Sequence, residues 1–221
     1  MDKVSRVPRT HKQAAQAYDR LSHWYDLISG SAEDSYKQIG LEYLAVEPGE
    51  SVLEIGFGTG KSLLTLSQSA TAAGQVVGID LSWGMCLQAK SRIQRQAEAQ
   101  DVHLIRADAA RIPLESGKIE ALFMSFTLEL FDTPEIPLIL QECRRVLSPG
   151  GRFCAVSLSL VEPEPAASRL YTQLHGIFPT FLDCRPIPLV ELVQSAGFRI
   201  LKQTDQKMWG LPVAITVAGL G

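Results

Sequence analysis

Residues 51–60 read Ser51-Val52-Leu53-Glu54-Ile55-Gly56-Phe57-Gly58-Thr59-Gly60, and this stretch decides the fold. Its first five residues are typical of a short buried strand. The residues that follow, 61–73, predict a helix. Three glycines at every second position therefore fall in a tight turn between a strand and a helix. Glycine allows unusual backbone angles and a close approach of the backbone to a ligand.

A second strand is predicted over residues 75–79, and it ends at Asp80. An acidic residue at the end of the second strand, about 20 residues beyond a glycine turn, is placed to accept hydrogen bonds from ribose hydroxyls. Taken alone, Asp80 would equally cap the next helix, although Ser82 fills that role as well. The turn and Asp80 together predict a cofactor that contains a nucleoside.

The glycine spacing separates two classes of cofactor. Turns that bind dinucleotides usually carry Gly-x-Gly-x-x-Gly and face a pyrophosphate. Here the pattern is acid-x-Gly-x-Gly-x-Gly, and Glu54 lies just before the turn. Its charge would repel a pyrophosphate but suit a cation, which disfavours an NAD-linked oxidoreductase.

This pattern resembles the first motif of the class I S-adenosylmethionine-dependent methyltransferases, whose cofactor carries an ammonium and a sulfonium. Three further segments carry the resemblance, namely residues 106–109, 120–126 and 147–152. Through residues 53–60, 125–131 and 184–187, the chain is most similar to the branch of the ubiquinone and menaquinone C-methyltransferases.

The resemblance implies an α/β fold with a Rossmann-like, doubly wound sheet of seven strands in the order 3-2-1-4-5-7-6, with strand 7 antiparallel. Two strands without a helix between them, 198–207 and 212–218, fit its closing hairpin. Residues 1–45, with a helix from about Thr10, are expected to form an N-terminal helical extension or lid. Residues 46–221 would form the cofactor-binding core, with residues 159–187 as an insertion on the acceptor side.

The resemblance also implies S-adenosyl-L-methionine as the cofactor, S-adenosyl-L-homocysteine as its product, and a set of contacts. Tyr18-Asp19 and Tyr25-Asp26 match a Tyr-Asp pattern that is common before the first motif. Tyr25 is predicted to close over the methionine end of the cofactor, although packing against the core would explain it equally. Asp108 is expected at the adenine, although a solvated loop carboxylate would look the same. The predicted cofactor-binding residues are Tyr25, Glu54, Gly56, Gly58, Gly60, Asp80, Leu81, Met85, Asp108, Ala109, Ser125 and Phe126.

The sequence dictates no catalytic residue. His175 and Glu129 are the candidates for a general base, because one lies in the acceptor-side insertion and the other follows the fourth predicted strand. A single histidine is more often structural. No spacing of metal ligands is evident, so no metal is expected.

Composition limits the remaining classes of function. The chain has 221 residues and a formal net charge of −3, which argues against a nucleic-acid surface. No apolar run of membrane-spanning length occurs, and residues 1–6 lack the apolar core of a signal peptide, so a cytoplasmic protein is expected. Contact with a membrane surface, and a monomer or a homodimer, are compatible with the sequence. The cysteines form no close pair and are expected to be reduced core residues: Cys86, Cys143, Cys154 and Cys184.

We therefore expect methyl transfer to a small acceptor. The apolar segment 178–181 fits a lipophilic acceptor that resembles a quinol or a lipid. Two alternatives keep the same cofactor. One is a protein that binds S-adenosylmethionine and regulates or scaffolds a partner, and the other is an enzyme that catalyses a different reaction, such as a cyclisation.

Overall fold

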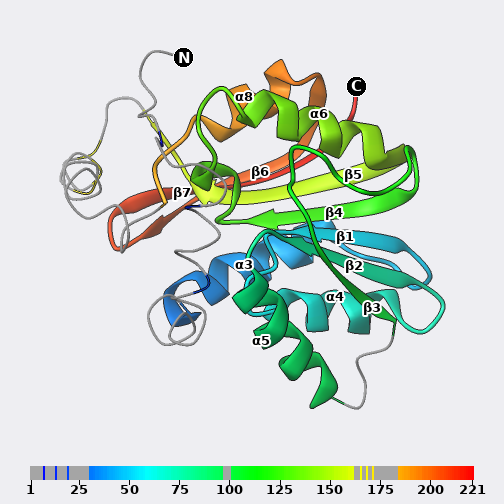
Figure 1. The fold of residues 1–221 in the computed structure, drawn as a ribbon. Helices are drawn as coiled ribbons and strands as arrows, with labels where there is room; N and C mark the ends of the chain where they lie inside the picture. Colours follow the sequence, from blue (N-terminus) through cyan, green and yellow to red (C-terminus); the bar gives the residue numbers. More distant parts are fainter. Residues whose placement is uncertain are drawn as a thin grey trace.

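The computed structural model describes residues 7, 13, 19, 30–96, 101–161, 165, 168, 171 and 184–221. Strands and helices alternate over most of this length (Figure 1). In chain order, the elements are α3 (Gly30–Leu44), β1 (Ser51–Ile55), α4 (Lys61–Ala70), β2 (Gln75–Asp80), α5 (Trp83–Gln94), β3 (Val102–Arg106), β4 (Ile119–Ser125), the short 3-10 helix η1 (Leu128–Leu130), α6 (Ile136–Val146), β5 (Leu147–Leu158), α8 (Leu189–Ser195), β6 (Phe198–Met208) and β7 (Leu211–Leu220).

The strands form a seven-stranded sheet in the order β3-β2-β1-β4-β5-β7-β6. Each pair from β3 across to β5 is parallel. Strand β7 runs antiparallel to β5 and to β6. The predicted fold class and strand order are confirmed. The carboxyl ends of the parallel strands therefore meet at one edge of the sheet, where α/β folds bind their ligands.

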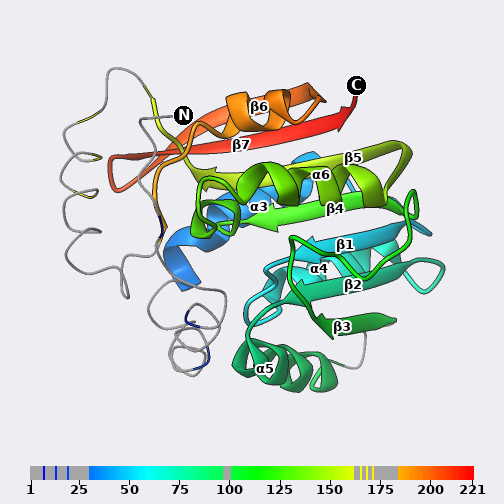
Figure 2. The same cartoon turned by 45° about the horizontal axis from the view of Figure 1, so that its top comes forward.

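Helices cover both faces of the sheet. Helices α6 and α8 lie on one face, and α3, α4 and α5 lie on the other (Figures 1 and 2). Successive residues of a strand point to opposite faces, so Leu53 of β1 joins the core beneath α6 and α8, while Val52 joins the core beneath α3 and α4. Burial on both faces explains why the central strands are almost continuously apolar.

Helix α3 was not predicted from the sequence. It packs against β4, β5 and β7, and Leu44 at its end is completely buried. A Cβ on Gly40 would lie 2.7 Å from Cγ2 of Val156, so the glycine is what allows the helix to lie this close to the sheet. The predicted helix from about Thr10 falls outside the described residues.

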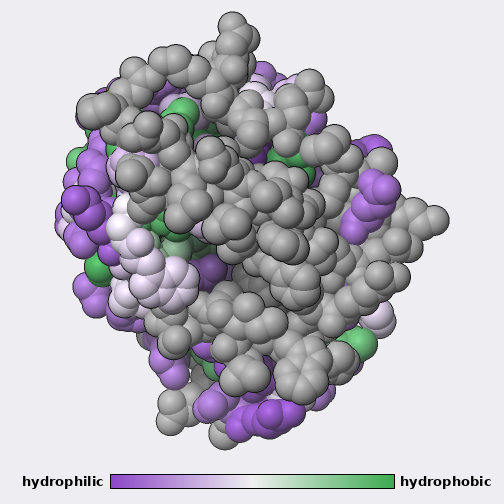
Figure 3. Space-filling view, turned by 90° about the vertical axis from the view of Figure 1, so that its left-hand side faces the viewer, coloured by the Kyte–Doolittle hydropathy of each residue, from purple (hydrophilic) through white to green (hydrophobic). Residues whose placement is uncertain are grey.

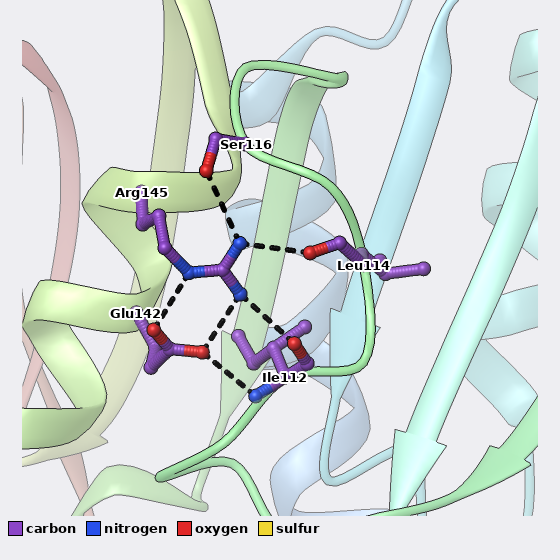
Figure 4. Close-up of polar contacts among 5 residues, drawn as sticks. All are labelled: Ile112, Leu114, Ser116, Glu142 and Arg145. Atoms are coloured by element: carbon purple, nitrogen blue, oxygen red, sulfur yellow. Dashed lines mark hydrogen bonds and ion pairs between the residues drawn. The ribbon is translucent and has the colours of Figure 1, made fainter.

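The connection from β3 to β4 contains no helix, and an ion-pair network holds it instead (Figure 4). The Arg145 guanidinium contacts Glu142 through Nε–Oε1 at 2.7 Å and Nη2–Oε2 at 2.8 Å. It also donates to the carbonyl oxygens of Ile112 and Leu114, each at 2.8 Å, and to the Ser116 hydroxyl at 3.3 Å. Glu142 accepts the amide of Ile112 at 2.8 Å. The loop that carries Asp108 is thereby fixed to α6.

We predict that Arg145→Met lowers the free energy of unfolding by about 1–3 kcal/mol, because two loop carbonyls and a carboxylate lose their donor. Urea denaturation measures the change. Lys118→Met is the matched control, since its ion pair with Glu115 is largely exposed and is expected to contribute little.

The same network predicts how the difference in the free energy of unfolding between the wild type and Arg145→Met depends on pH. Hydrogen bonds from Arg145 hold the pKa of Glu142 below its usual value. A carboxyl group with a lowered folded pKa stabilises the fold above its unfolded pKa, and this contribution is lost as the pH falls through the folded pKa. The stability gap between the wild type and Arg145→Met should therefore narrow in acid. A gap that stays constant down to pH 3 would contradict this account.

Candidate active site

The turn between β1 and α4 needs glycine for more than one reason. Gly56, Gly58 and Gly60 all have positive φ values, of 71°, 54° and 81°. At Gly58 a Cβ would meet nothing within 4 Å, so the backbone there borders open space. At Gly60 a Cβ would lie 2.8 Å from the Cβ of Ala89, so this glycine allows α4 and α5 to pack. Gly58 is therefore suited to a ligand and Gly60 to helix packing.

Asp80 connects this turn to the next one. Its Oδ2 accepts the amide of Gly58 and its Oδ1 accepts the amide of Ser82, both at 2.9 Å. Ser82 caps α5 by accepting the amide of Met85 at 3.1 Å, so Asp80 is free of that role. A carboxylate has about four lone-pair sites, so at least one remains after the bonds from the backbone amides. Asp80 can thus order the glycine turn and still accept a bond from a ligand.

Asp19 reaches the same place from the N-terminal segment. Its Oδ1 accepts the Ser82 hydroxyl at 2.6 Å and the amide of Gly84 at 2.9 Å. Partial burial opposes ionisation, but these bonds outweigh it and keep the pKa of Asp19 below its usual value. The sequence analysis noted Asp19 only as part of a Tyr-Asp pattern. Its position at the start of α5 depends on a contact across 63 residues of the chain.

A single cavity collects the predicted residues at the carboxyl edge of the sheet. Figure 3 views the molecule from this side, toward which β4 points in Figure 1. Gly60 does not line the cavity, and Tyr25 lies outside the described residues. The predicted residues that line it are Glu54, Gly56, Gly58, Asp80, Leu81, Met85, Asp108, Ala109, Ser125 and Phe126.

Glu54 is the most strongly perturbed group in this cavity. It is 2% exposed, and burial raises the pKa of its carboxyl to about 8, against the opposing effects of the Lys37 charge and a Ser62 hydrogen bond. Its Oε2 has no hydrogen-bond partner. A buried acceptor without a partner is costly unless a ligand supplies a donor. Burial also raises the pKa of Asp80 to about 6, although three backbone amides oppose the shift.

These features fit a cofactor that has a cationic amino-acid end and a ribose. Glu54 offers an unused acceptor for an ammonium group. Asp80 offers acceptors for ribose hydroxyls, and the open side of Gly58 offers space between the two. Phe126 and Met85 supply apolar surface. Phe126 itself has a φ of 47°, an uncommon angle for a bulky residue and one that recurs at functional sites.

A further group of residues lines the same cavity, three of them apolar and two acidic. Val7, Leu130 and Phe131 line it, together with the carboxylates of Asp132 and Glu135. Val7 is held there because its amide donates to Oδ1 of Asp132 at 3.0 Å. Sequence reasoning missed Val7, since nothing in the first residues marks it.

Of the two candidates for a general base, the structure describes only Glu129. His175 lies outside the described residues. Glu129 is completely buried and does not line the cavity; its Oε1 accepts the amide of Leu158 at 3.2 Å, which ties η1 to β5. Burial raises the pKa of Glu129 to about 8. Within the described residues, Glu129 therefore connects η1 to β5 and does not border the cavity. Across the described ranges, no cluster of acidic, histidine and cysteine side chains could hold a metal ion.

Comparison with known proteins agrees with the fold. Residues 52–151, which include the glycine turn, Asp80 and Asp108, match the methyltransferase domain family. Residues 52–151 therefore form a methyltransferase domain, and the strand order around it is that expected for the class I S-adenosylmethionine-dependent methyltransferases. S-adenosylmethionine is accordingly its cofactor, and the residues that contact it remain a prediction.

The methyltransferase is similar to several curated proteins. It is 28% identical over 177 residues to the 2-phytyl-1,4-naphtoquinone methyltransferase of Trichormus variabilis, covering 80% of this chain and 72% of that protein. It is 28% identical to the demethylmenaquinone methyltransferase of Lactococcus lactis, over 72% of this chain and 62% of that one. A 37.1 kDa transposon protein of Streptomyces fradiae is 35% identical, but the chain spans only 45% of its length.

Solved structures share the fold at lower identity. The [4+2]-cyclase SpnF superposes with a TM-score of 0.76 at 19% identity, covering 97% of this chain and 98% of that one. A methyltransferase from Aquifex aeolicus superposes with a TM-score of 0.60 at 18% identity, over 82% of this chain and 88% of that one. At these identities the likeness shows the fold alone.

We predict that Glu54→Gln makes the free protein more stable and its cofactor affinity lower. A carboxyl group whose folded pKa is raised loses stability as the pH rises from its unfolded to its folded value, here up to about 8, and glutamine removes that cost. The substitution also removes the anion that an ammonium would face.

Thermal melting of the free proteins tests the change in stability, and calorimetric titration with S-adenosylmethionine at pH 7 in two buffers of different ionisation enthalpy tests the change in affinity and its proton linkage. Wild-type binding should release a proton from Glu54, and Glu54→Gln should not. Equal proton release by the two proteins would be inconsistent with the role given to Glu54. The exposed Glu115→Gln serves as the control.

We predict that Asp80→Asn weakens the binding of S-adenosylmethionine by roughly 1–3 kcal/mol. The asparagine NH2 group would face one of the two amides that Asp80 now accepts, so the turn and the ribose both lose an acceptor. The dissociation constant and the melting temperature of the free protein are measured together. An unchanged dissociation constant would show that Asp80 does not contact the cofactor.

Proposed function

We propose that this methyltransferase transfers its methyl group to a small lipophilic acceptor of the quinol class. The observation that carries the proposal is that the cavity lined by Glu54 and Asp80 is also lined by the apolar side chains of Val7, Leu130 and Phe131. The curated relatives named as naphthoquinone and menaquinone methyltransferases support the choice of acceptor class.

The chain's own residues mainly bind, orient and exclude water. When bound, the cofactor supplies an electrophilic methyl group on its sulfonium. Glu54 and Asp80 would hold the two ends of the cofactor, and Phe126 would separate it from the apolar region. Aligning an acceptor atom with the carbon–sulfur bond can supply much of the acceleration. An acceptor hydroxyl or acidic carbon must also lose a proton. His175 remains the candidate base in our proposal. Glu129 is disfavoured as the base because it is buried and does not line the cavity.

Delivery of such an acceptor requires access from a lipid phase. No helix in the described ranges is long and apolar enough to cross a membrane. Trp209 is 79% exposed at the tip of the β6–β7 hairpin, two residues after Lys207. This tip lies at the carboxyl edge of the sheet, because the start of β7 pairs with the end of β5. Tryptophan favours the membrane interface. We infer peripheral contact with a lipid surface by this edge.

Methyl transfer is favoured over the alternatives with the same cofactor. The relatives at 26–29% identity carry names of methyltransferases. The cyclase structure, at 19% identity, shares the fold without indicating the reaction. A protein that only binds the cofactor would yield no methylated product, which makes product formation the decisive measurement.

The proposal is tested with methyl-labelled S-adenosylmethionine and a panel of reduced naphthoquinols and benzoquinols that differ in tail length. Mass spectrometry should detect label in a quinol product and S-adenosylhomocysteine in equal amount. Transfer to a hydrophilic acceptor alone, or cofactor binding without any product across the panel, would refute the proposed acceptor class.

We predict that Phe131→Ala raises the KM for a quinol acceptor about tenfold or more, because a bulky apolar side chain leaves the acceptor region. The dissociation constant of S-adenosylmethionine should stay within about twofold, since the polar region is unchanged. Leu138→Ala is the control, because Leu138 is 52% exposed on α6 and does not line the cavity. A change in cofactor affinity with no change in the KM for the quinol would contradict the assignment of Phe131 to acceptor binding.

A further inference from the structure

Lys37 reaches the polar end of the cavity from α3, a helix outside the motifs of the sequence. It lines the cavity, and its side chain is 19% exposed. Its Nζ lies 2.8 Å from Oε2 of Glu33, one helical turn away, and 5.9 Å from the centre of the Phe126 ring. A lysine ammonium held over an aromatic ring and beside a carboxylate is ordered before any ligand arrives.

The charge of Lys37 acts directly on Glu54. It is the strongest of the influences that oppose the effect of burial on the pKa of Glu54. The wall of one cavity thus carries both the Lys37 cation and a buried glutamate whose Oε2 has no hydrogen-bond partner. No hydrogen bond or ion pair joins Lys37 to Glu54 in the part of the chain that the structure describes. A ligand that carries both charges could therefore bind both side chains.

We propose that Lys37 and Glu54 form a subsite for the α-amino-acid group of S-adenosylmethionine, in which Lys37 binds the carboxylate and Glu54 binds the ammonium. The two groups of the ligand are bonded to the same carbon, so whatever receives the carboxylate must lie beside the acceptor of the ammonium. Lys37 meets this requirement. This inference rests on S-adenosylmethionine being the cofactor. It does not depend on which acceptor molecule is methylated.

Lys61 is the competing cation in the same wall. Its Nζ lies 3.0 Å from Oδ2 of Asp34, and its side chain is 35% exposed, nearly twice the exposed fraction of Lys37. Solvent screens a more exposed charge more strongly. Lys37 is thus the better partner for a carboxylate beside Glu54, and Lys61→Met provides a matched control.

The test compares two ligands that differ only in the carboxylate, S-adenosylmethionine and decarboxylated S-adenosylmethionine. Their dissociation constants are measured by calorimetry for the wild type, Lys37→Met, Lys37→Arg and Lys61→Met, with thermal melting to verify that each variant is folded. The wild type should prefer the carboxylated ligand by about tenfold or more, as expected for a charge-assisted hydrogen bond.

In Lys37→Met this preference should fall to about twofold or less, through weaker binding of the carboxylated ligand. Lys37→Arg should restore much of it, and Lys61→Met should leave it unchanged. The proposal is overturned if Lys37→Met weakens both ligands equally or binds neither while folded, since Lys37 would then act only through Glu54. Loss of the preference in Lys61→Met would assign the carboxylate to Lys61. Failure of the wild type to bind either ligand would instead refute the cofactor-site assignment.

Discussion

The bridge that Asp80 makes between two backbone amides is the interaction on which the site depends. One oxygen holds Gly58 in the turn after β1, and the other holds Ser82 at the start of α5. Because β1 and β2 are adjacent parallel strands, both turns leave the same edge of the sheet. A single carboxylate therefore sets the spacing between the glycine turn and the next helix, and with it the width of the cofactor cavity.

The site is maintained at a cost in stability. Burial makes the carboxyl groups of Glu54 and Asp80 harder to ionise; the charge of Asp80 raises the pKa of Glu54 further, and the charge of Asp19 does the same to Asp80. An unliganded Oε2 on Glu54 has no compensation from the protein. Buried polar groups that lack partners are uncommon in native structures, and they are concentrated where a ligand completes them. Phe126, with a φ of 47°, borders the same cavity.

Contacts between segments distant in the chain complete the cavity. The connection from β3 to β4 contains no helix. Arg145 on α6 holds it by donating to the carbonyl oxygens of the loop after Asp108. Asp19 reaches α5, and Val7 reaches Asp132 across 125 residues. Gly40 allows α3 to pack on β5, which places Lys37 beside the glycine turn. None of these four contacts has a local sequence pattern, because each depends on which elements the sheet order brings together.

The strands of the sheet, the glycine turn and Asp80 could be predicted from the sequence by itself, and the strand order followed from its resemblance to the class I methyltransferases. Apolar strands, the glycine turn and Asp80 are local patterns whose spacing is set by element length and by the alternation of strand and helix. The tertiary structure alone decided that α3 exists as a packed helix, that Gly60 serves helix packing, and that Glu129 is buried away from the cavity. These outcomes depend on neighbours from other strands and helices, since burial and close approach are properties of the assembled layers and not of any segment.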